Sequence, residues 1–166
     1  MQMPHEFFTH VLSLDGLKLP GLGEYGVGMI FLPQDFEERS ICEAHIERIV
    51  ENEGQSIIGW RDVPVNNGHI GYIAKQSQPV IRQVFIAKNQ FIEDEGAFER
   101  KLYVIRKEIE HSIDKMGIEI RDSFYVASLS SNRVVYKGLL MGTQLEGFYT
   151  DLSNKDFTSG FAMVHA

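Results

Sequence analysis

Cysteine is almost absent from this chain, because Cys42 is the only one among 166 residues. A lone thiol excludes an intrachain disulfide and suits a protein of the reducing cytoplasm. Long hydrophobic runs are also missing, since every apolar stretch is far shorter than a membrane span. Residues 1–15 lack the basic start and the unbroken apolar core of a secretory signal. We therefore expect a cytoplasmic protein without a membrane partner.

Basic residues are outnumbered by acidic ones, with 16 Lys and Arg against 23 Asp and Glu and a net charge of −7. Because binding to a phosphate backbone needs a basic face, we expect no nucleic-acid partner. The length fits one domain that buries about two-thirds of its unfolded surface. No low-complexity linker or internal repeat divides the chain.

The hydrophobic pattern predicts an α+β domain in which helices cover one face of a largely antiparallel sheet. Three helices are expected. The first covers residues 5–14, and the third covers residues 95–116. The second begins at an Asp35 cap, with Glu38 completing a capping box, and stops at Gly54, and short helical turns are expected near Tyr72 and at 144–149. Expected strands cover residues 27–32, 56–65, 80–87, 123–129, 133–139 and 160–165. Ser130-Ser131-Asn132 predicts a hairpin between the fourth and fifth of these strands.

Two histidine patterns resemble metal sites without completing one. His5 and His10 are five residues apart, about 140° around a helix, whereas the zinc-protease pattern places two His four residues apart on one face. Cys42 and His45 are three residues apart, but a zinc site needs three or four ligands. Cys42 lies on an apolar helical stripe, so we interpret it as a small buried hydrophobe.

No other pattern assembles a reactive site. Residues 21–26 space their glycines as a dinucleotide fingerprint does, but they follow a Pro-containing loop and lead into an apolar strand instead of a helix. Residues 128–131 offer serine hydroxyls without a nucleophile elbow. Residues 93–95 are acidic and suit the start of a helix. We therefore assign no catalytic, cofactor-binding or metal-binding residue.

Five longer blocks, in order along the chain, resemble one protein family. They read GEYGVGMIFLPQD, IIGWRDVPV, QPVIRQVFIAK, AFERKLYVIRKEIE and FYVASLSSNRVVYKGLLMGTQLEGFYTDL. Together they are similar to the glutamine amidotransferase domain of the large subunit of glutamate synthase, over nearly the whole chain. The resemblance implies that residues 1–166 form a single partial amidotransferase domain. It also implies part of the four-layer αββα sandwich of the N-terminal-nucleophile hydrolases.

The resemblance explains the YGVG of residues 25–28. Members of the family carry a Cys-Gly-Val-Gly nucleophile at the mature N-terminus and, later, a separate strand like EYGVGMIFLP. In such enzymes the Cys thiolate attacks glutamine and the α-amino group of the same residue takes the proton. Tyr25 matches the later strand, so YGVG is interpreted as a core strand and not as a decayed nucleophile.

The family's catalytic segments have no counterpart in this sequence. The nucleophile would precede Met1, the substrate-gripping Arg follows a His-Ser pair where this chain has His165-Ala166, and the Asn-Gly oxyanion segment lies further on. The FMN and iron–sulfur cluster of the family belong to other domains, so no cofactor is expected here. The abrupt ends predict that the chain is part of something longer.

Two functions of different class remain open. The chain is either the central part of a glutaminase module, inactive alone, or a non-catalytic binding or assembly subunit that complements or regulates a complete synthase. An unrelated metal- or nucleotide-binding module is a weaker third alternative. A partial sandwich leaves strand edges and an apolar sheet face without partners, so we expect a homo-oligomer or association with the remaining parts of a synthase.

Overall fold

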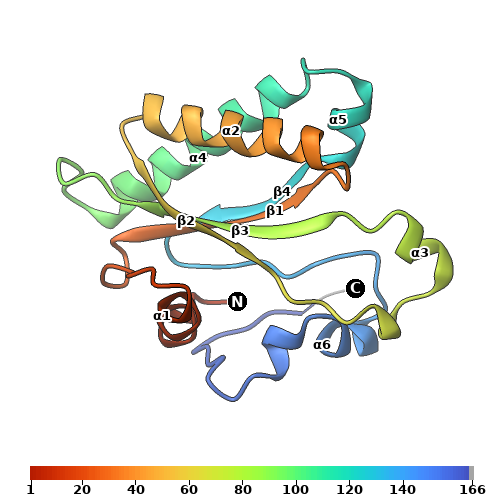
Figure 1. The fold of residues 1–166 in the computed structure, drawn as a ribbon. Coiled ribbons are helices and arrows are strands. Elements are labelled where there is room, and N and C mark those ends of the chain that lie inside the picture. Colours follow the sequence, from red (N-terminus) through yellow and green to blue (C-terminus); the bar gives the residue numbers. More distant parts are fainter. Residues whose placement is uncertain (165–166) are drawn as a thin grey trace.

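The computed structural model describes residues 1–164, except the side chains at 118, 119 and 121 within one short helix. Four strands form one antiparallel sheet in the order β2-β3-β1-β4 (Figure 1). The strands are β1 (Tyr25–Leu32), β2 (Ser56–Asp62), β3 (Val80–Ala87) and β4 (Tyr125–Ser130). The expected α+β class with an antiparallel sheet is thus confirmed.

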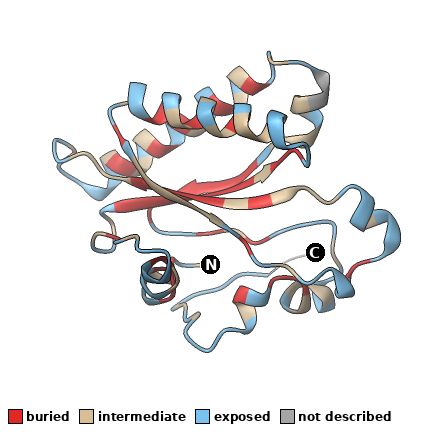
Figure 2. Ribbon diagram, in the orientation of Figure 1, coloured by how far each residue is buried: buried red, intermediate tan, exposed pale blue. Residues whose placement is uncertain are grey.

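Helices α2 (Phe36–Asn52) and α4 (Glu95–Ile113) cover one face of the sheet (Figure 1). Asp35 begins α2 by accepting hydrogen bonds from the backbone N–H groups of Glu37 and Glu38 at 2.9 and 3.0 Å. The expected return bond from the Glu38 side chain is not formed among the described residues. The apolar stripe of α4 is buried from Phe98 to Ile113, on the side that meets the sheet (Figure 2), whereas Met116, the last residue of the expected helix, is partly buried and lies beyond the end of α4.

The opposite face is covered by α1 (His5–Leu14) and by the C-terminal third of the chain. That third contains α6 (Leu145–Phe148) and the short helices η2 (Gly142–Gln144) and η3 (Thr150–Ser153). Both sheet faces are therefore apolar, which explains why β1 is hydrophobic along its whole length. Along β1, Ile30 and Leu32 pack under α2 and α4, while Val27 and Met29 face the other side.

The glycines of YGVG allow close packing on β1. A Cβ added at Gly26 would lie 2.6 Å from Leu102 Cδ1 of α4, and one at Gly28 would lie 2.6 Å from Val84 Cγ1 of β3. Real side chains do not approach so closely, so glycine is required for the observed spacing. The interpretation of residues 25–28 as a core strand is confirmed.

Two predicted strands are wrong. Residues 133–139 form no strand of the sheet, because their backbone turns away from β4 and meets the N-terminus instead: Val134 N donates to Met1 O at 3.0 Å, and Gln2 bridges Arg133. Residues 160–164 are also irregular, with one backbone bond from Gln2 N to Phe161 O at 2.9 Å. His165 lies outside the described residues. These segments lie side by side in the layer below the sheet and lack the ladder that defines a strand.

The remaining elements are short, and their boundaries differ slightly from expectation. β2 ends at Asp62 instead of Val65, before Pro64, which has no N–H to donate. The 3₁₀ turn η1 (Asn67–His69) follows it, and then α3 (Tyr72–Gln76), which is the helical turn expected near Tyr72. A short helix, α5 (Ile118–Ser123), was not predicted and follows Gly117, whose φ is +124°. Among residues 1–164, no helix combines the length and the apolar character needed to cross a bilayer.

Candidate functional site

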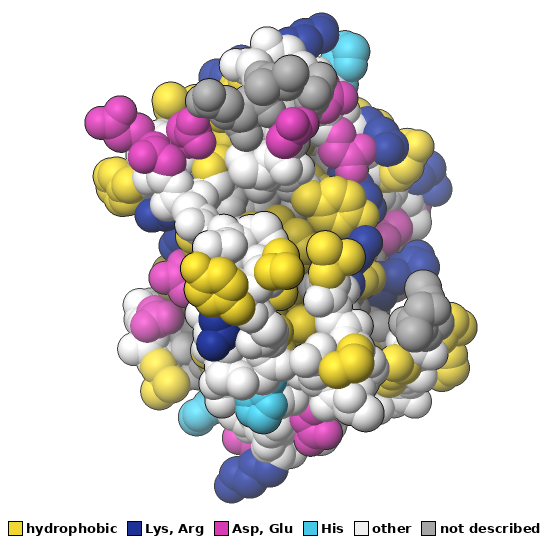
Figure 3. All heavy atoms as spheres, turned by 90° about the vertical axis from the view of Figure 1, so that its right-hand side faces the viewer, with side chains coloured by type: hydrophobic (Ala, Val, Ile, Leu, Met, Phe, Trp, Pro, Cys, Tyr) yellow, Lys and Arg dark blue, Asp and Glu magenta, His cyan; other side chains and the backbone are white. Residues whose placement is uncertain are grey.

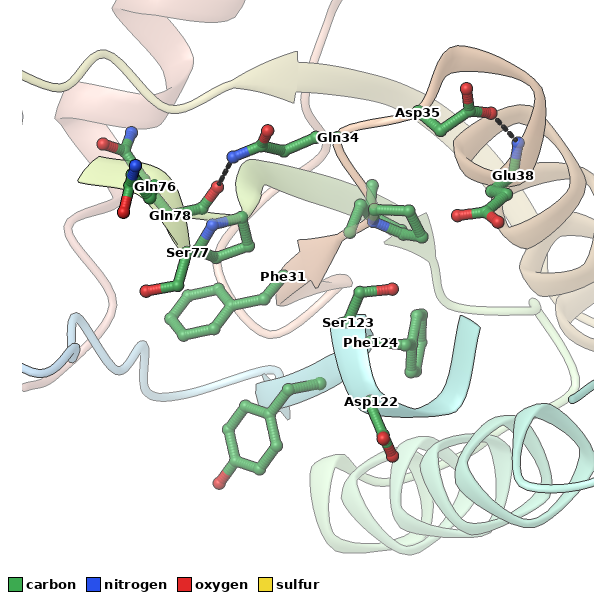
Figure 4. A pocket seen from close by; sticks show the side chains of 14 residues that line it. Phe31, Gln34, Asp35, Glu38, Gln76, Ser77, Gln78, Asp122, Ser123 and Phe124 are labelled. Atoms are coloured by element: carbon green, nitrogen blue, oxygen red, sulfur yellow. Dashed lines mark hydrogen bonds between the residues drawn. The ribbon is translucent and has the colours of Figure 1, made fainter. Parts of the chain in front are cut away.

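A cavity of about 570 Å³ opens where β1 ends, and we name it the β1-end cavity. Three loops surround it: the turn from β1 into α2, the segment between α3 and β3, and the connection from α5 to β4 (Figure 4). Its lining comprises residues 31–35, Glu38, 76–79 and 122–125. The cavity therefore lies at the end of the sheet, beside the short helices α3 and α5.

The floor of the β1-end cavity is largely apolar and aromatic. Phe31 and Phe124 lie on either side of it (Figure 4), and Tyr125 adds a third ring. The Phe31 and Tyr125 rings are 5.9 Å apart between centroids. Gln34 ties two of the surrounding loops together, because its Nε2 donates to the backbone oxygen of Gln78 at 2.5 Å.

Three carboxylates from described residues line the β1-end cavity, and they differ in what they contact. Asp35 is engaged in capping α2, and Asp122 points away from Glu38 (Figure 4). Glu38 is half-buried, and its side chain, which extends toward the Phe124 side of the cavity (Figure 4), forms no hydrogen bond or ion pair with the described residues. The Gln78 Oε1 atom is a buried acceptor that also has no hydrogen-bond partner in the described part of the chain. The cavity is therefore rich in acceptors.

The described residues that line the β1-end cavity include no Cys, His or Lys. Its Ser77 and Ser123 hydroxyls donate to the backbone oxygens of Ile73 and Ile120 at 3.4 and 3.1 Å. This arrangement suits the binding of a donor or cation more than covalent catalysis.

A second polar centre lies buried between the sheet and the layer below it. Asp151 accepts two hydrogen bonds from the Arg61 guanidinium, at 2.6 and 2.8 Å, and one from the Tyr136 hydroxyl at 2.8 Å. Gln83 completes the cluster by accepting from Arg61 at 2.8 Å and donating to Tyr136 at 3.1 Å. We name these four residues the Arg61 cluster. They satisfy one another, so the cluster ties η3 to β2 and β3.

Ionisation within the Arg61 cluster follows its contacts. Burial alone would lower the pKa of Arg61, but the hydrogen bonds and charge of Asp151 outweigh it and raise that pKa. The pKa of Tyr136 is raised, first by burial and then by the Asp151 carboxylate. The cluster is therefore a fixed ion pair with a neutral phenol, which is typical of structural polar networks and offers no group poised for proton transfer near neutral pH.

Cys42 and His45 do not form a site together. Cys42 is completely buried between α2 and the sheet, and burial, followed by the Glu38 and Glu43 carboxylates, raises the pKa of its thiol to about 11. His45 instead contacts Ser112 at 2.7 Å and Arg48 at 2.9 Å. Among the residues that the structure describes, no group of three His, Cys, Asp or Glu side chains is placed to hold a metal. The interpretation of Cys42 as a buried hydrophobe is confirmed.

The histidine, glycine, serine and acidic patterns noted in the sequence make contacts that support the fold. His5 and His10 lie on α1 as predicted, and His5 Nδ1 contacts the hydroxyl of buried Tyr25 at 3.1 Å. Residues 21–26 lead into β1 and not into a helix, as expected. The Ser128 hydroxyl accepts from the backbone N–H of Val135 at 3.2 Å. Asp94 caps α4 through the N–H of Ala97 at 2.7 Å, in agreement with the acidic start expected there.

Comparison with known proteins identifies relatives over the full chain. The profile of the class II glutamine amidotransferases matches residues 1–166. The chain is 46% identical to the glutamate synthase [NADPH] large chain of Bacillus subtilis over 100% of its own length, and that match covers 10% of the relative. It is 35% identical to ferredoxin-dependent glutamate synthase 2 of Synechocystis, over 98% of this chain and 10% of the relative.

Relatives in plants show the same proportions. The chain is 37% identical to the chloroplastic ferredoxin-dependent glutamate synthase of rice, over 98% of its own length and 10% of that relative. It therefore spans about a tenth of the length of the curated relatives that it matches. The profile match over all residues and the 46% identity indicate the same family, and the helix-covered antiparallel sheet is consistent with it. The chain therefore belongs to the class II glutamine amidotransferases, which have the N-terminal-nucleophile hydrolase fold.

Proposed function

We propose that residues 1–166 are the central part of the glutaminase module of a glutamate synthase, the module that releases ammonia from glutamine for glutamate synthesis. The observation that carries the proposal is the 46% identity to a glutamate synthase large chain over every residue of this chain. The role of these residues is then to supply a rigid sheet between two covered faces. A rigid scaffold is what holds a nucleophile and its oxyanion donors in productive geometry.

We also propose that these residues do not hydrolyse glutamine by themselves. An N-terminal-nucleophile enzyme needs a thiol on a residue whose own α-amine takes the proton. The sole thiol of this sequence is Cys42, which is internal, completely buried and protonated at neutral pH because its pKa is raised to about 11. A buried thiol with a raised pKa is a poor nucleophile. The reaction would therefore depend on residues other than these.

Replacement of the matching segment in a relative tests the proposal. In the Bacillus subtilis large chain, the segment aligned with residues 1–166 is replaced by this sequence. The control is the unaltered Bacillus subtilis enzyme, reassembled with the same cloning junctions at both ends of that segment. We expect the exchanged enzyme to retain glutamine hydrolysis within about tenfold of the parent, since the scaffold is preserved. A folded, soluble chimera that hydrolyses no glutamine would contradict the assignment.

The partners, cofactors and location proposed for the chain follow from the same assignment. We propose that it works as part of a larger synthase in the cytoplasm, or as a homo-oligomer through its exposed apolar side chains, and that FMN and iron–sulfur chemistry belongs to other domains. The relatives are much longer polypeptides, which supports association with further domains. Light scattering at tens of micromolar measures the oligomeric state, and a purely monomeric mass would count against self-association.

A further inference from the structure

A second cavity, of about 190 Å³, adjoins the β1-end cavity. The two share Phe31 and residues 77–79 in their linings. The second cavity is lined mainly by apolar side chains from α3, β3, α6 and residues 137–140, including Ala74, Ile81 and Phe148. We name the two together the β1-end groove. It places an acceptor-rich hollow next to an apolar one.

The surface beside the β1-end groove is unusually apolar. Tyr72 and Ile73 of α3 are 75% and 80% exposed, and Leu139 and Met141 are 96% and 65% exposed. Figure 3, which looks at this end of the sheet, shows hydrophobic side chains gathered near the middle of the face with acidic side chains above them. Exposed apolar groups that gather beside a hollow are typical of an interaction surface.

The acceptor-rich half of the β1-end groove fits a cation. The Glu38 side chain is half-buried without a partner among the described residues, and no Lys, Arg or His is among the described side chains that line the β1-end cavity. Aromatic rings attract cations, and the Phe31 and Phe124 rings line this cavity. The Tyr125 ring is already contacted by the Lys137 ammonium, which lies 4.6 Å from its centre. A guanidinium or ammonium on an aliphatic stem would contact both the carboxylate and the apolar walls.

We propose that the β1-end groove binds a polypeptide segment that carries a basic side chain close to an apolar one. The basic side chain enters the β1-end cavity toward Glu38, and the apolar side chain enters the second cavity beside Leu139. A polypeptide is favoured over a free amine because two hollows of different chemistry adjoin. The net charge of −7 favours a basic partner, and the tenfold greater length of the relatives provides polypeptide outside the matched residues.

Binding is tested with the purified chain and a set of peptides. Each peptide is acetylated and amidated and contains one arginine and one leucine separated by zero to three glycines. Amide chemical shifts in two-dimensional NMR report the site of binding and the Kd. We expect at least one peptide to shift residues of α3 and of the turn after β1, and replacement of its arginine by glutamate to weaken binding about tenfold or more.

Matched variants separate the two halves of the β1-end groove. Glu38→Gln should weaken the peptide about tenfold, whereas Glu37→Gln, one residue away and outside the cavity lining, should change binding less than about twofold. Leu139→Ser should also weaken it, whereas Leu14→Ser on α1, where the side chain is 74% exposed, should not. The proposal is overturned if no peptide shifts these residues, if Glu38→Gln binds normally, or if N-acetyl-arginine amide binds as tightly as the best peptide.

Discussion

Replacement of Asp151 by asparagine should destabilise the domain more than any surface substitution. The Arg61 and Asp151 side chains are only 10% and 3% exposed, and the carboxylate accepts three hydrogen bonds. Asp151→Asn keeps the shape but leaves a buried guanidinium without its counter-charge. Removal of one partner from a buried ion pair costs about 3–5 kcal/mol. For a chain of this size that loss lowers the Tm by about 6–20 °C.

Urea unfolding provides the assay. Trp60 is the only tryptophan and lies next to Arg61 on β2, so its fluorescence reports unfolding of the sheet, and circular dichroism checks that the transition is shared. Lys107→Met is the surface control, because it breaks the 2.7 Å pair with Glu110 where Lys107 is 53% exposed, and Glu110 keeps its pair with Arg106, so the loss should be small beside that of Asp151→Asn.

A double variant separates the cost of an orphaned charge from the value of the pair. Arg61→Met with Asp151→Leu removes both charges and should destabilise less than Asp151→Asn alone, because no buried charge is left unpaired. A loss below about 1 kcal/mol in Asp151→Asn would refute the reasoning, since it would mean that the Arg61 cluster is solvated and does not tie η3 to the sheet.

Three further predictions concern packing and ionisation. Gly28→Ala should lower the free energy of unfolding, measured in urea, by about 1–2 kcal/mol, because the new methyl group meets the stiff Val84 side chain. Gly142→Ala, with open space around it, should leave that free energy unchanged, and equal effects of the two variants would contradict the packing. Cys42 should resist iodoacetamide at pH 8 until urea unfolds the chain, because its thiol is buried with a pKa of about 11; rapid native labelling would show it accessible. Burial and the Arg48 charge lower the pKa of His45. Below the ordinary histidine pKa of 6.5 the unfolded state therefore binds more protons than the folded state, so the free energy of unfolding should rise as the pH increases toward 6.5, and His45→Gln should flatten that rise.

The sequence predicted the sheet and its main helices because each carries a complete local signal. β3 and α1 have the expected bounds, and α4 begins at Glu95 as expected but ends at Ile113, three residues before the expected end. The stripe, the Asp35 and Asp94 caps and the glycine stops act within a few residues, so single-sequence reasoning is sufficient for them. The two-sided burial of β1 was likewise visible in its uninterrupted apolar run.

Strand predictions were wrong where strand formation depends on partners that are distant in the sequence. Val134 and Tyr136 are buried on alternate positions, as in a strand, but the backbone of this segment pairs with residues 1–3, a partner that local pattern cannot supply. The Arg61 cluster was missed for a related reason. Arg61 interrupts a strand-like apolar segment, which is a visible signal, but its counter-charge Asp151 is 90 residues away.

The β1-end cavity was also beyond sequence reasoning. Its three loops come from residues 31–38, 76–79 and 122–125, and no motif links them. Glu38 was predicted to complete a capping box, and the free side chain that borders the cavity instead is a consequence of tertiary packing. Family membership came from long ordered blocks of similarity, which carry information that periodicity and charge do not.

The central claim is that these residues supply the scaffold of a class II glutaminase and not its nucleophile. Ammonia release from glutamine by the purified 166-residue polypeptide, with Cys42→Ala beside it, tests that claim most directly. The account predicts no ammonia above the protein-free blank for either protein. Steady turnover by the unaltered polypeptide, and above all turnover that Cys42→Ala abolishes, would contradict it.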